Sequence, residues 1–241
     1  MASAQPNQSL IDGLECLAAL ATARVPVGSR ELARQLGMEP TRANRLLKTL
    51  ASLGIAQQTP TRQYVPGPGM HVLATQSLLG SGLIRHSLAP LESLRDLNLD
   101  VAMGVLWRDR VCYLYFASPG MPLALALGRV GLFPAVRSSI GLALLAREPL
   151  SHVRTLFPGE QVPDFAGKSF DALLTRLKKV QSTGYARVKQ SESTTSLAVA
   201  IDNLPASVAL SGNLLAFDTS TLVRRLTDVA SMIAVAQEPM S

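Results

Sequence analysis

The feature that most constrains the fold of this sequence is a pair of short helical patterns that meet at a glycine between Ser29 and Leu53. In the first pattern, the apolar residues at positions 32, 33 and 36 share one helical face. Gly37 follows, and a glycine readily takes the left-handed conformation that reverses a chain. The second pattern begins near Pro40 and places the apolar residues at 43, 46, 47 and 50 on its inner face. Two short helices joined in this way predict a helix-turn-helix.

The outward face of the second predicted helix carries polar and basic side chains, which are the types that contact base edges and phosphates. The Ser29 hydroxyl is expected to cap the first of the two helices, and Thr41 either caps the second or contacts DNA. A solvated helix face is the alternative, and for Arg45 an ion pair within the domain is as reasonable as a phosphate contact. The residues predicted to contact DNA are Ser29, Arg30, Thr41, Arg42, Asn44, Arg45, Lys48 and Arg62.

The charge of the chain is concentrated in the same segment. The net charge is +6, and seven basic but only two acidic residues lie between positions 24 and 62. A local excess of positive charge favours a polyanionic partner, because phosphates along a duplex are neutralised by Lys and Arg. The charge distribution therefore supports double-stranded DNA as the partner of this segment.

Two further patterns complete the N-terminal unit. A helix is expected from Ser9 to Ala23, with the leucines at positions 10, 14, 17 and 20 on its inner face. After Gly54, the segment IAQQTPTRQYV predicts two short strands around a Thr-Pro-Thr-Arg turn, with Arg62 near the tip. Three helices followed by such a wing predict a winged helix-turn-helix domain over residues 1–66.

The remaining chain predicts a connector and an α+β domain built on an antiparallel sheet. Pro66-Gly67-Pro68-Gly69 marks a boundary, and a helical pattern from Met70 to about Leu79 predicts a linker helix within residues 67–82. Residues 83–241 mix helical and strand patterns. The expected elements are a helix over 84–97, a hairpin over 101–117, a strand and loop over 122–136, a helix over 138–146, a helix over 170–183, strands over 196–202 and 206–212, and a helix over 219–236.

Several classes of protein are excluded by composition and motif content. No apolar run approaches the roughly 20 residues of a membrane span, and no export signal is evident, so we expect a cytoplasmic protein. The two cysteines, Cys16 and Cys112, sit in apolar patterns and are expected to be buried thiols. The three histidines have no metal-ligand spacing, and no nucleophile elbow or phosphate-binding glycine loop is present. We therefore expect no metal, no cofactor and no enzymatic activity.

The sequence resembles the IclR family of bacterial transcriptional regulators over nearly its whole length. The motifs that carry the resemblance are QSLIDGLECLAAL, RELARQLGMEPTRANRLLKTLASLG, RQYVPGPGMHVLA, GRVGLFPAVRSSIGLALLA and GYARVKQSESTTSLAVAID, in this order. The resemblance implies a GAF-like effector-binding and oligomerisation domain behind the winged helix. It also implies a homodimer, or a homotetramer formed as a dimer of dimers, on a palindromic operator.

The resemblance further implies an effector pocket, in which several polar family positions are apolar here. The usual His is Val136, an often acidic position is Val188, and the usual Arg-Cys pair falls on Leu197 and Ala198. An apolar lining favours a ligand with few polar groups, since unpaired polar groups are costly to bury. We expect a hydrophobic or aromatic metabolite, with Ser138, Ser139 or Ser211 holding its polar end, although Ser139 and Ser211 are equally compatible with structural roles. The predicted effector-binding residues are Leu125, Phe133, Ser138, Ser139, Ile140, Val188, Ala198, Ala209 and Ser211.

The sequence thus predicts a sequence-specific DNA-binding regulator, repressor or activator, whose operator binding is controlled by a small molecule. One alternative is a metabolite sensor that acts through protein contacts without binding DNA. The other is an enzyme domain fused to a regulatory head, for which the sequence offers no catalytic motif.

Overall fold

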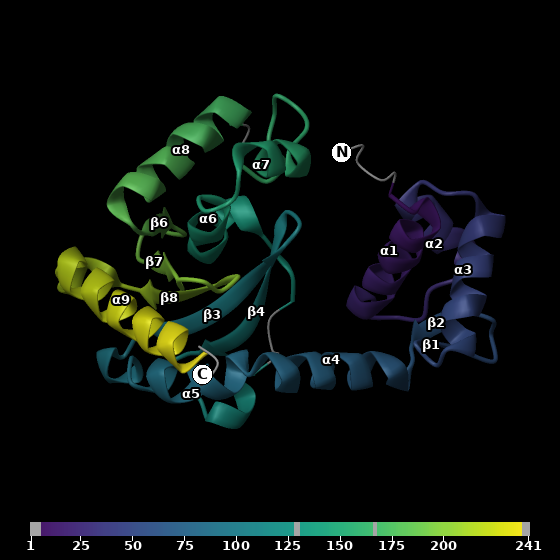
Figure 1. Cartoon of the computed structure of the whole chain (residues 1–241), viewed down its shortest axis with the longest axis horizontal. Helices are drawn as coiled ribbons and strands as arrows, with labels where there is room; N and C mark the ends of the chain where they lie inside the picture. Colours follow the sequence, from purple (N-terminus) through teal and green to yellow (C-terminus); the bar gives the residue numbers. More distant parts are fainter. Residues whose placement is uncertain (1–5, 128–130, 166–167, 238–241) are drawn as a thin grey trace. The chain divides into compact units, whose positions relative to one another are not determined.

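The structure is a computed structural model of the 241-residue chain, and it describes residues 6–127, 131–165 and 168–237. The chain divides into two compact units, Met1–Ser81 and Gly82–Ser241 (Figure 1). The first unit contains helices and a two-stranded hairpin, and the second contains a six-stranded sheet with helices. The predicted α+β fold class is therefore confirmed.

The N-terminal unit is a three-helix core with a wing. Its elements are α1 (Gln8–Thr22), α2 (Ser29–Leu36), α3 (Pro40–Ser52), β1 (Ala56–Gln58), β2 (Tyr64–Pro66) and α4 (Pro68–Ser81). Helix α2 ends at Gly37, whose φ of 64° is the left-handed conformation predicted for the turn. Strands β1 and β2 pair antiparallel, and Val27 bridges to Tyr64 beside them. A small core holds the unit together, formed by Cys16, Leu20, Leu32, Leu47, Ala56 and Tyr64.

Two predictions for this unit are wrong in detail. Leu10 and Leu14 of α1 are exposed at 62% and 50%, whereas Asp12 and Cys16 of the same helix are buried. Helix α1 carries apolar residues on more than one face, so its packing against α2 and α3 decides which face is covered. Ser29 does not cap α2 either, because the N-cap is Gly28 and no side chain caps that helix.

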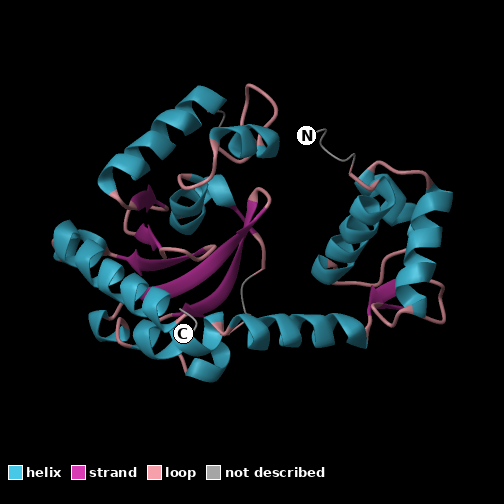
Figure 2. Cartoon of the chain, in the orientation of Figure 1, coloured by secondary structure: helices cyan, strands magenta, loops and turns pink. Residues whose placement is uncertain are grey.

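The C-terminal unit is built around an antiparallel sheet of strand order β5-β4-β3-β8-β7-β6. The strands are β3 (Asp100–Trp107), β4 (Arg110–Ala117), β5 (Phe133–Pro134), β6 (Ala186–Lys189), β7 (Thr195–Ala200) and β8 (Ala206–Gly212). Helices α5 (Leu83–Glu92) and α9 (Thr219–Ala236) cover one face, and α6 (Ser139–Leu145), α7 (Leu150–Leu156) and α8 (Phe170–Thr183) lie on the other (Figures 1 and 2). Short 3-10 helices at Arg95–Leu97, Leu123–Leu125, Ala135–Arg137 and Leu214–Ala216 complete the unit.

Alternate residues of the strands enter two separate cores, one on each face of the sheet. Leu197, Val208 and Leu210 pack toward α5 and α9, while Ala198 and Ala209 pack toward α6. This is the period of two that a sheet covered on both faces requires. A row of alanines runs across four neighbouring strands beneath α6, formed by the register partners Ala102, Ala209, Ala198 and Ala186. Methyl side chains let a helix approach the sheet closely, and every residue of α6 is buried.

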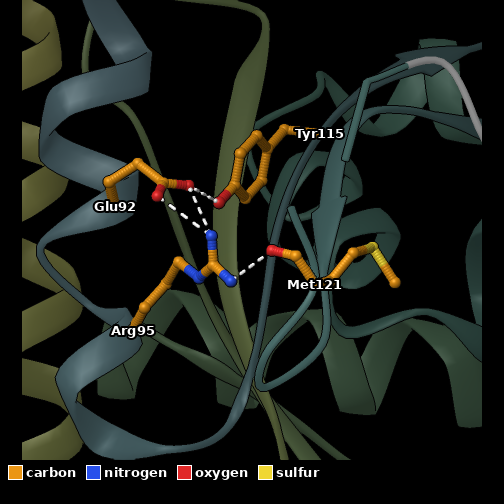
Figure 3. Close-up of polar contacts among 4 residues, drawn as sticks. All are labelled: Glu92, Arg95, Tyr115 and Met121. Carbon is orange, nitrogen blue, oxygen red and sulfur yellow. Dashed lines mark hydrogen bonds and ion pairs between the residues drawn. The ribbon is translucent and has the colours of Figure 1, made fainter. Parts of the chain in front are cut away.

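A polar cluster ties α5 to β4 on the opposite face (Figure 3). Tyr115 is fully buried, and its hydroxyl donates a hydrogen bond to Glu92 Oε1 at 2.5 Å. Arg95 pairs with Glu92 at 3.0 Å through Nη1 and donates through Nη2 to the Met121 carbonyl. Burial and the neighbouring Glu92 carboxylate both raise the pKa of Tyr115, because each disfavours the phenolate. The cluster holds the first helix of this unit and the segment after β4 in one arrangement.

Some elements of this unit differ from the sequence prediction. The helix expected over 84–97 ends at Glu92 and is followed by a 3-10 turn. The strand expected within 122–136 is reduced to the two residues of β5, and Leu123–Leu125 forms a 3-10 helix instead; residues 128–130 of that segment lie outside the described residues. Helix α7 and strand β6 were not predicted, because each is short and has weak periodicity.

Candidate DNA-binding surface and ligand cleft

The exposed face of α3 is the candidate recognition surface. Thr41, Arg45 and Lys48 are exposed and spaced so that they share one side of the helix, opposite the buried Ala43 and Leu47. Thr41 is not a cap, because the N-cap of α3 is Glu39 and the first helical residue is Pro40. This face can contact base edges and phosphates together.

Arg42 does not have the outward orientation predicted from the sequence. Its guanidinium Nε lies 2.5 Å from Oδ2 of Asp12 in α1, and the other Asp12 oxygen accepts a hydrogen bond from Gln8 at 2.7 Å. The Asp12 side chain is 9% exposed and that of Arg42 36%. A carboxylate this deeply buried requires a charged partner, so Arg42 joins α3 to α1. Asn44, also predicted to face outward, is half-buried.

The other predicted DNA contacts lie at the start of α2 and at the wing tip. Ser29 is half-buried and Arg30 exposed in the first turn of α2. Arg62 is exposed in the turn between β1 and β2, with a φ of 60° and its amide bonded to the Thr59 carbonyl at 2.9 Å. Within the described ranges, no ion pair with a carboxylate involves Arg30, Arg45, Lys48 or Arg62, whereas Arg34 is paired with Glu31. The exposed cations therefore remain available to phosphates.

The C-terminal unit contains a cleft of about 1100 Å³ on the face of the sheet that carries α8. Aromatic and branched side chains form its apolar part, and they come from β4, β5, β6, the 3-10 helix at Ala135–Arg137 and the segment before α8. These residues are Tyr113, Phe116, Phe133, Val136, Phe165 and Val188. One side of α8 lines it with residues at helical spacing, from Ala172 to Thr183. Clefts of this size and character hold small organic ligands.

Tyr113 brings a hydrogen-bonding group to the cleft. Its hydroxyl lies 3.0 Å from Ser138 Oγ, and Ser138 in turn caps α6 by accepting from the Gly141 amide. Burial raises the pKa of the Tyr113 phenol, although the Ser138 hydrogen bond acts in the opposite direction. Tyr113 is therefore neutral near pH 7 and can donate or accept a hydrogen bond to a ligand.

Only two of the nine predicted effector residues, Phe133 and Val188, line this cleft. Ser138 is buried behind Tyr113, and Ser139 and Ile140 are buried within α6. Ala198 and Ala209 lie beneath α6, where the helix covers them. Leu125 is 55% exposed in a 3-10 helix, and Ser211 borders a separate, shallower depression beside Asp100.

The lining is also more charged than the sequence predicted. Arg137, Lys168, Arg176, Lys179, Arg187 and Lys189 all border the cleft. Arg137 is distant in the sequence from the other five, which fall between positions 168 and 189 in and around α8 and β6. The basic residues that flank apolar positions in α8 and β6 were the signal that the sequence offered for this cluster. We call these six cations the rim of the cleft and its aromatic and branched side chains the floor. The prediction of an unusually apolar pocket is therefore wrong for the rim and describes only the floor.

Metal-binding clusters and membrane-spanning helices are both absent from the described part of the chain. In the described ranges, His, Cys, Asp and Glu side chains form no group of three or more suited to a metal ion. Among the described helices, none combines the length and hydropathy needed to cross a membrane.

Comparison with known proteins agrees with the helix-turn-helix and with the full fold. Residues 9–60 match the IclR helix-turn-helix domain. A curated relative, the HTH-type transcriptional regulator BhcR of Paracoccus denitrificans, is 25% identical over 166 residues, and the alignment spans 65% of this chain and 58% of that protein.

Two solved structures are similar over nearly their whole length. An IclR family transcriptional regulator from Brucella abortus has a TM-score of 0.75 at 22% identity, covering 96% of this chain and 93% of that one. An IclR homologue from Microbacterium hydrocarbonoxydans, complexed with 4-hydroxybenzoate, has a TM-score of 0.67 at 19% identity, covering 95% and 99%. The Paracoccus and Brucella relatives are named as transcriptional regulators, which agrees with the prediction that the chain is not an enzyme. Residues 9–60 are therefore an IclR-type helix-turn-helix domain, and the full-length fold is the one found in IclR family regulators.

Proposed function

We propose that this protein binds double-stranded operator DNA through α3 and the wing, and that a small molecule in the cleft controls this binding. The observation that carries the proposal is the set of exposed cations at the start of α2, along α3 and at the wing tip, which have no carboxylate partner among the described residues. A helix that presents Thr41, Arg45 and Lys48 on one face suits insertion into a major groove, with the wing at the adjacent backbone.

Association of two chains is supported by apolar surface on the N-terminal unit. No residue of α4 is buried, and Val72, Leu73 and Leu79 are each more than half exposed. The helix has no Asp, Glu, Lys or Arg in its 14 positions. Leu10 and Leu14 on α1 are also exposed. Exposed apolar surface of this kind marks protein interfaces, so we expect a homodimer, or a dimer of dimers, whose two recognition helices read a palindromic operator.

An effector in the cleft is supported by its chemistry. The 4-hydroxybenzoate bound by the Microbacterium relative has an aromatic ring and one carboxylate. Here, Tyr113, Phe116 and Phe133 offer aromatic surface and the rim offers cations. The effector is therefore expected to be an organic acid with an apolar body. Whether it releases or promotes operator binding, its effect must be reciprocal: DNA changes effector affinity by the same factor.

Fluorescence anisotropy with labelled DNA from the intergenic regions flanking the gene tests the DNA-binding part. We expect Arg45→Ala and Lys48→Ala to weaken binding. A variant that no longer touches one phosphate should show a slope of log affinity against log salt that is smaller by about one. Arg34→Gln is the matched control, because Arg34 is already paired with Glu31 on α2 at 2.6 Å. If all three variants bind like the unmodified protein, α3 is not the recognition helix. If no flanking DNA is bound and the protein still binds small acids, the sensor without DNA binding becomes the better description.

A further inference from the structure

The rim of the ligand cleft differs from the rest of the C-terminal unit in how its charges are balanced. Several arginines elsewhere in this unit pair with carboxylates, as Arg95 does with Glu92, Arg147 with Asp202 and Arg225 with Asp96. The lining of the cleft holds six basic side chains, and no Asp or Glu is present among its described residues. In the described part of the chain, no carboxylate pairs with any of the six.

The contacts that these cations do make involve aromatic rings and a backbone carbonyl, which do not neutralise their charges. The Arg137 guanidinium lies 5.8 Å from the centre of the Phe133 ring, and Lys168 Nζ lies 5.6 Å from that of Phe165. Arg176 donates to the backbone carbonyl of Arg187 at 2.6 Å. Each contact leaves a full positive charge at the edge of the cleft. Like charges gathered within about a Debye length of one another repel, and an anion placed among them relieves that repulsion.

The cations border a cleft that has an apolar floor. Tyr113, Phe116 and Phe133 present aromatic surface there, and Val136 and Val188 extend it. Arg187 and Lys189 alternate with Val188 along β6, the strand at the edge of the sheet, so they border the cleft from that edge. The volume of about 1100 Å³ exceeds what one small acid fills. The ligand must therefore match two surfaces at once, one apolar and one with several positive charges.

We propose that the cleft selects an amphipathic ligand with two or more negative charges, carboxylate or phosphate, at the rim formed by α8 and β6, and an apolar body on the aromatic floor. This inference rests on the proposed function, since it names the chemical class of the effector. A ligand with a single carboxylate neutralises one of six cations, whereas each further anionic group gains another favourable interaction.

The first test varies the number of carboxylates on one benzene ring and measures the affinity of the protein for each compound. Benzoate, benzene-1,3-dicarboxylate and benzene-1,3,5-tricarboxylate are titrated into the full-length protein by calorimetry at low and at moderate salt. We expect affinity to rise roughly tenfold for each added carboxylate at low salt, and the gain to shrink as salt screens it. Phenyl phosphate distinguishes a preference for phosphate from one for carboxylate. Equal affinity across the series overturns the proposal, and so does the absence of binding by every multiply charged probe at millimolar concentration.

The second test uses two neighbouring lysines of α8. Lys179 lines the cleft, whereas Lys178 is exposed outside its lining. Lys179→Gln, alone and combined with Arg187→Gln, is expected to weaken tricarboxylate binding several-fold per residue, and Lys178→Gln is expected to leave it unchanged. Equal effects of the two lysine variants contradict a specific role of the rim.

Operator binding separates failure of this inference from failure of the proposed function. If a singly charged acid alters operator affinity as strongly as the tricarboxylate does, the protein is a ligand-controlled regulator and only the charge inference fails. If saturating tricarboxylate binds and leaves operator affinity unchanged, the charge inference holds and the control mechanism fails. If Lys179→Gln weakens operator binding without any ligand, the rim contacts DNA, and the ligand inference is overturned.

Discussion

Replacing Arg42 by alanine is expected to loosen the N-terminal unit instead of removing only a DNA contact. Arg42→Ala leaves the Asp12 carboxylate, 9% exposed, with the Gln8 amide as its remaining partner. Removing one member of a fully buried ion pair costs about 3–5 kcal/mol. The Arg42 side chain is 36% exposed, and solvent screening reduces the value of such a pair. We therefore expect the opening free energy of this unit to fall by about 2 kcal/mol.

Hydrogen exchange read by mass spectrometry suits this prediction, because the single tryptophan, Trp107, lies in the other unit. Peptides from α1 and α3 report local opening free energies directly. Arg45→Ala is the matched control on the same helix, because Arg45 is exposed. The opening free energy of this variant should differ from that of the unmodified protein by no more than about 0.5 kcal/mol. Adding Asp12→Asn to Arg42→Ala should recover part of the stability, with a coupling energy of about 1–2 kcal/mol.

The protection of α1 and α3 in Arg42→Ala distinguishes a structural ion pair from a DNA contact. If Arg42→Ala leaves α1 and α3 as protected as in the unmodified protein and weakens operator binding as Arg45→Ala does, the pair with Asp12 is not structural. Arg42 would then act as the outward DNA contact that the sequence first indicated.

Three further predictions concern the C-terminal unit and association. Gly141→Ala should cost at least about 2 kcal/mol, because a Cβ there would lie 2.2 Å from the Ala135 carbonyl oxygen; an unchanged melting temperature contradicts the close packing of α6. Burial and Glu92 raise the folded-state pKa of Tyr115 above the unfolded value of about 10, so its stabilisation is complete below that pH and is lost as pH rises further. Urea denaturation from pH 8 to 11 should accordingly show a shallower alkaline decline for Tyr115→Phe, and identical profiles would count against this account. Leu79→Asp should weaken self-association in sedimentation experiments, whereas Leu150→Asp, also an exposed leucine but on α7, should not; equal behaviour would exclude α4 as the interface.

The sequence by itself determined the parts of this protein whose conformation is local. The turn at Gly37 follows from the conformational freedom of glycine, and the start of α3 at Pro40 follows from the tolerance of proline in a first helical turn. The wing was predicted from its turn residues, and Arg62 lies in that turn as expected. The long helices α8 and α9 begin and end at the predicted positions, because each has strong periodicity and a clear cap.

Which face of a helix is buried was decided only by tertiary packing. The periodicity of α1 indicated a leucine face, but Leu10 and Leu14 are exposed and Asp12 is inside, where Arg42 of α3 neutralises it. A carboxylate can occupy that position only because a cation from another helix reaches it. No pattern within α1 contains that information.

The ligand cleft depended on tertiary structure even more. Ala198 and Ala209 occupy the predicted strands, yet α6 lies over them, so they pack and do not line the cleft. Arg137 is distant in the sequence from Lys179 and Lys189, yet all three border one cleft in the folded unit. The sequence determined the DNA-binding unit through local backbone preferences, whereas the cleft exists only after long-range packing brings Arg137 and the aromatic floor to the cations in and around α8 and β6.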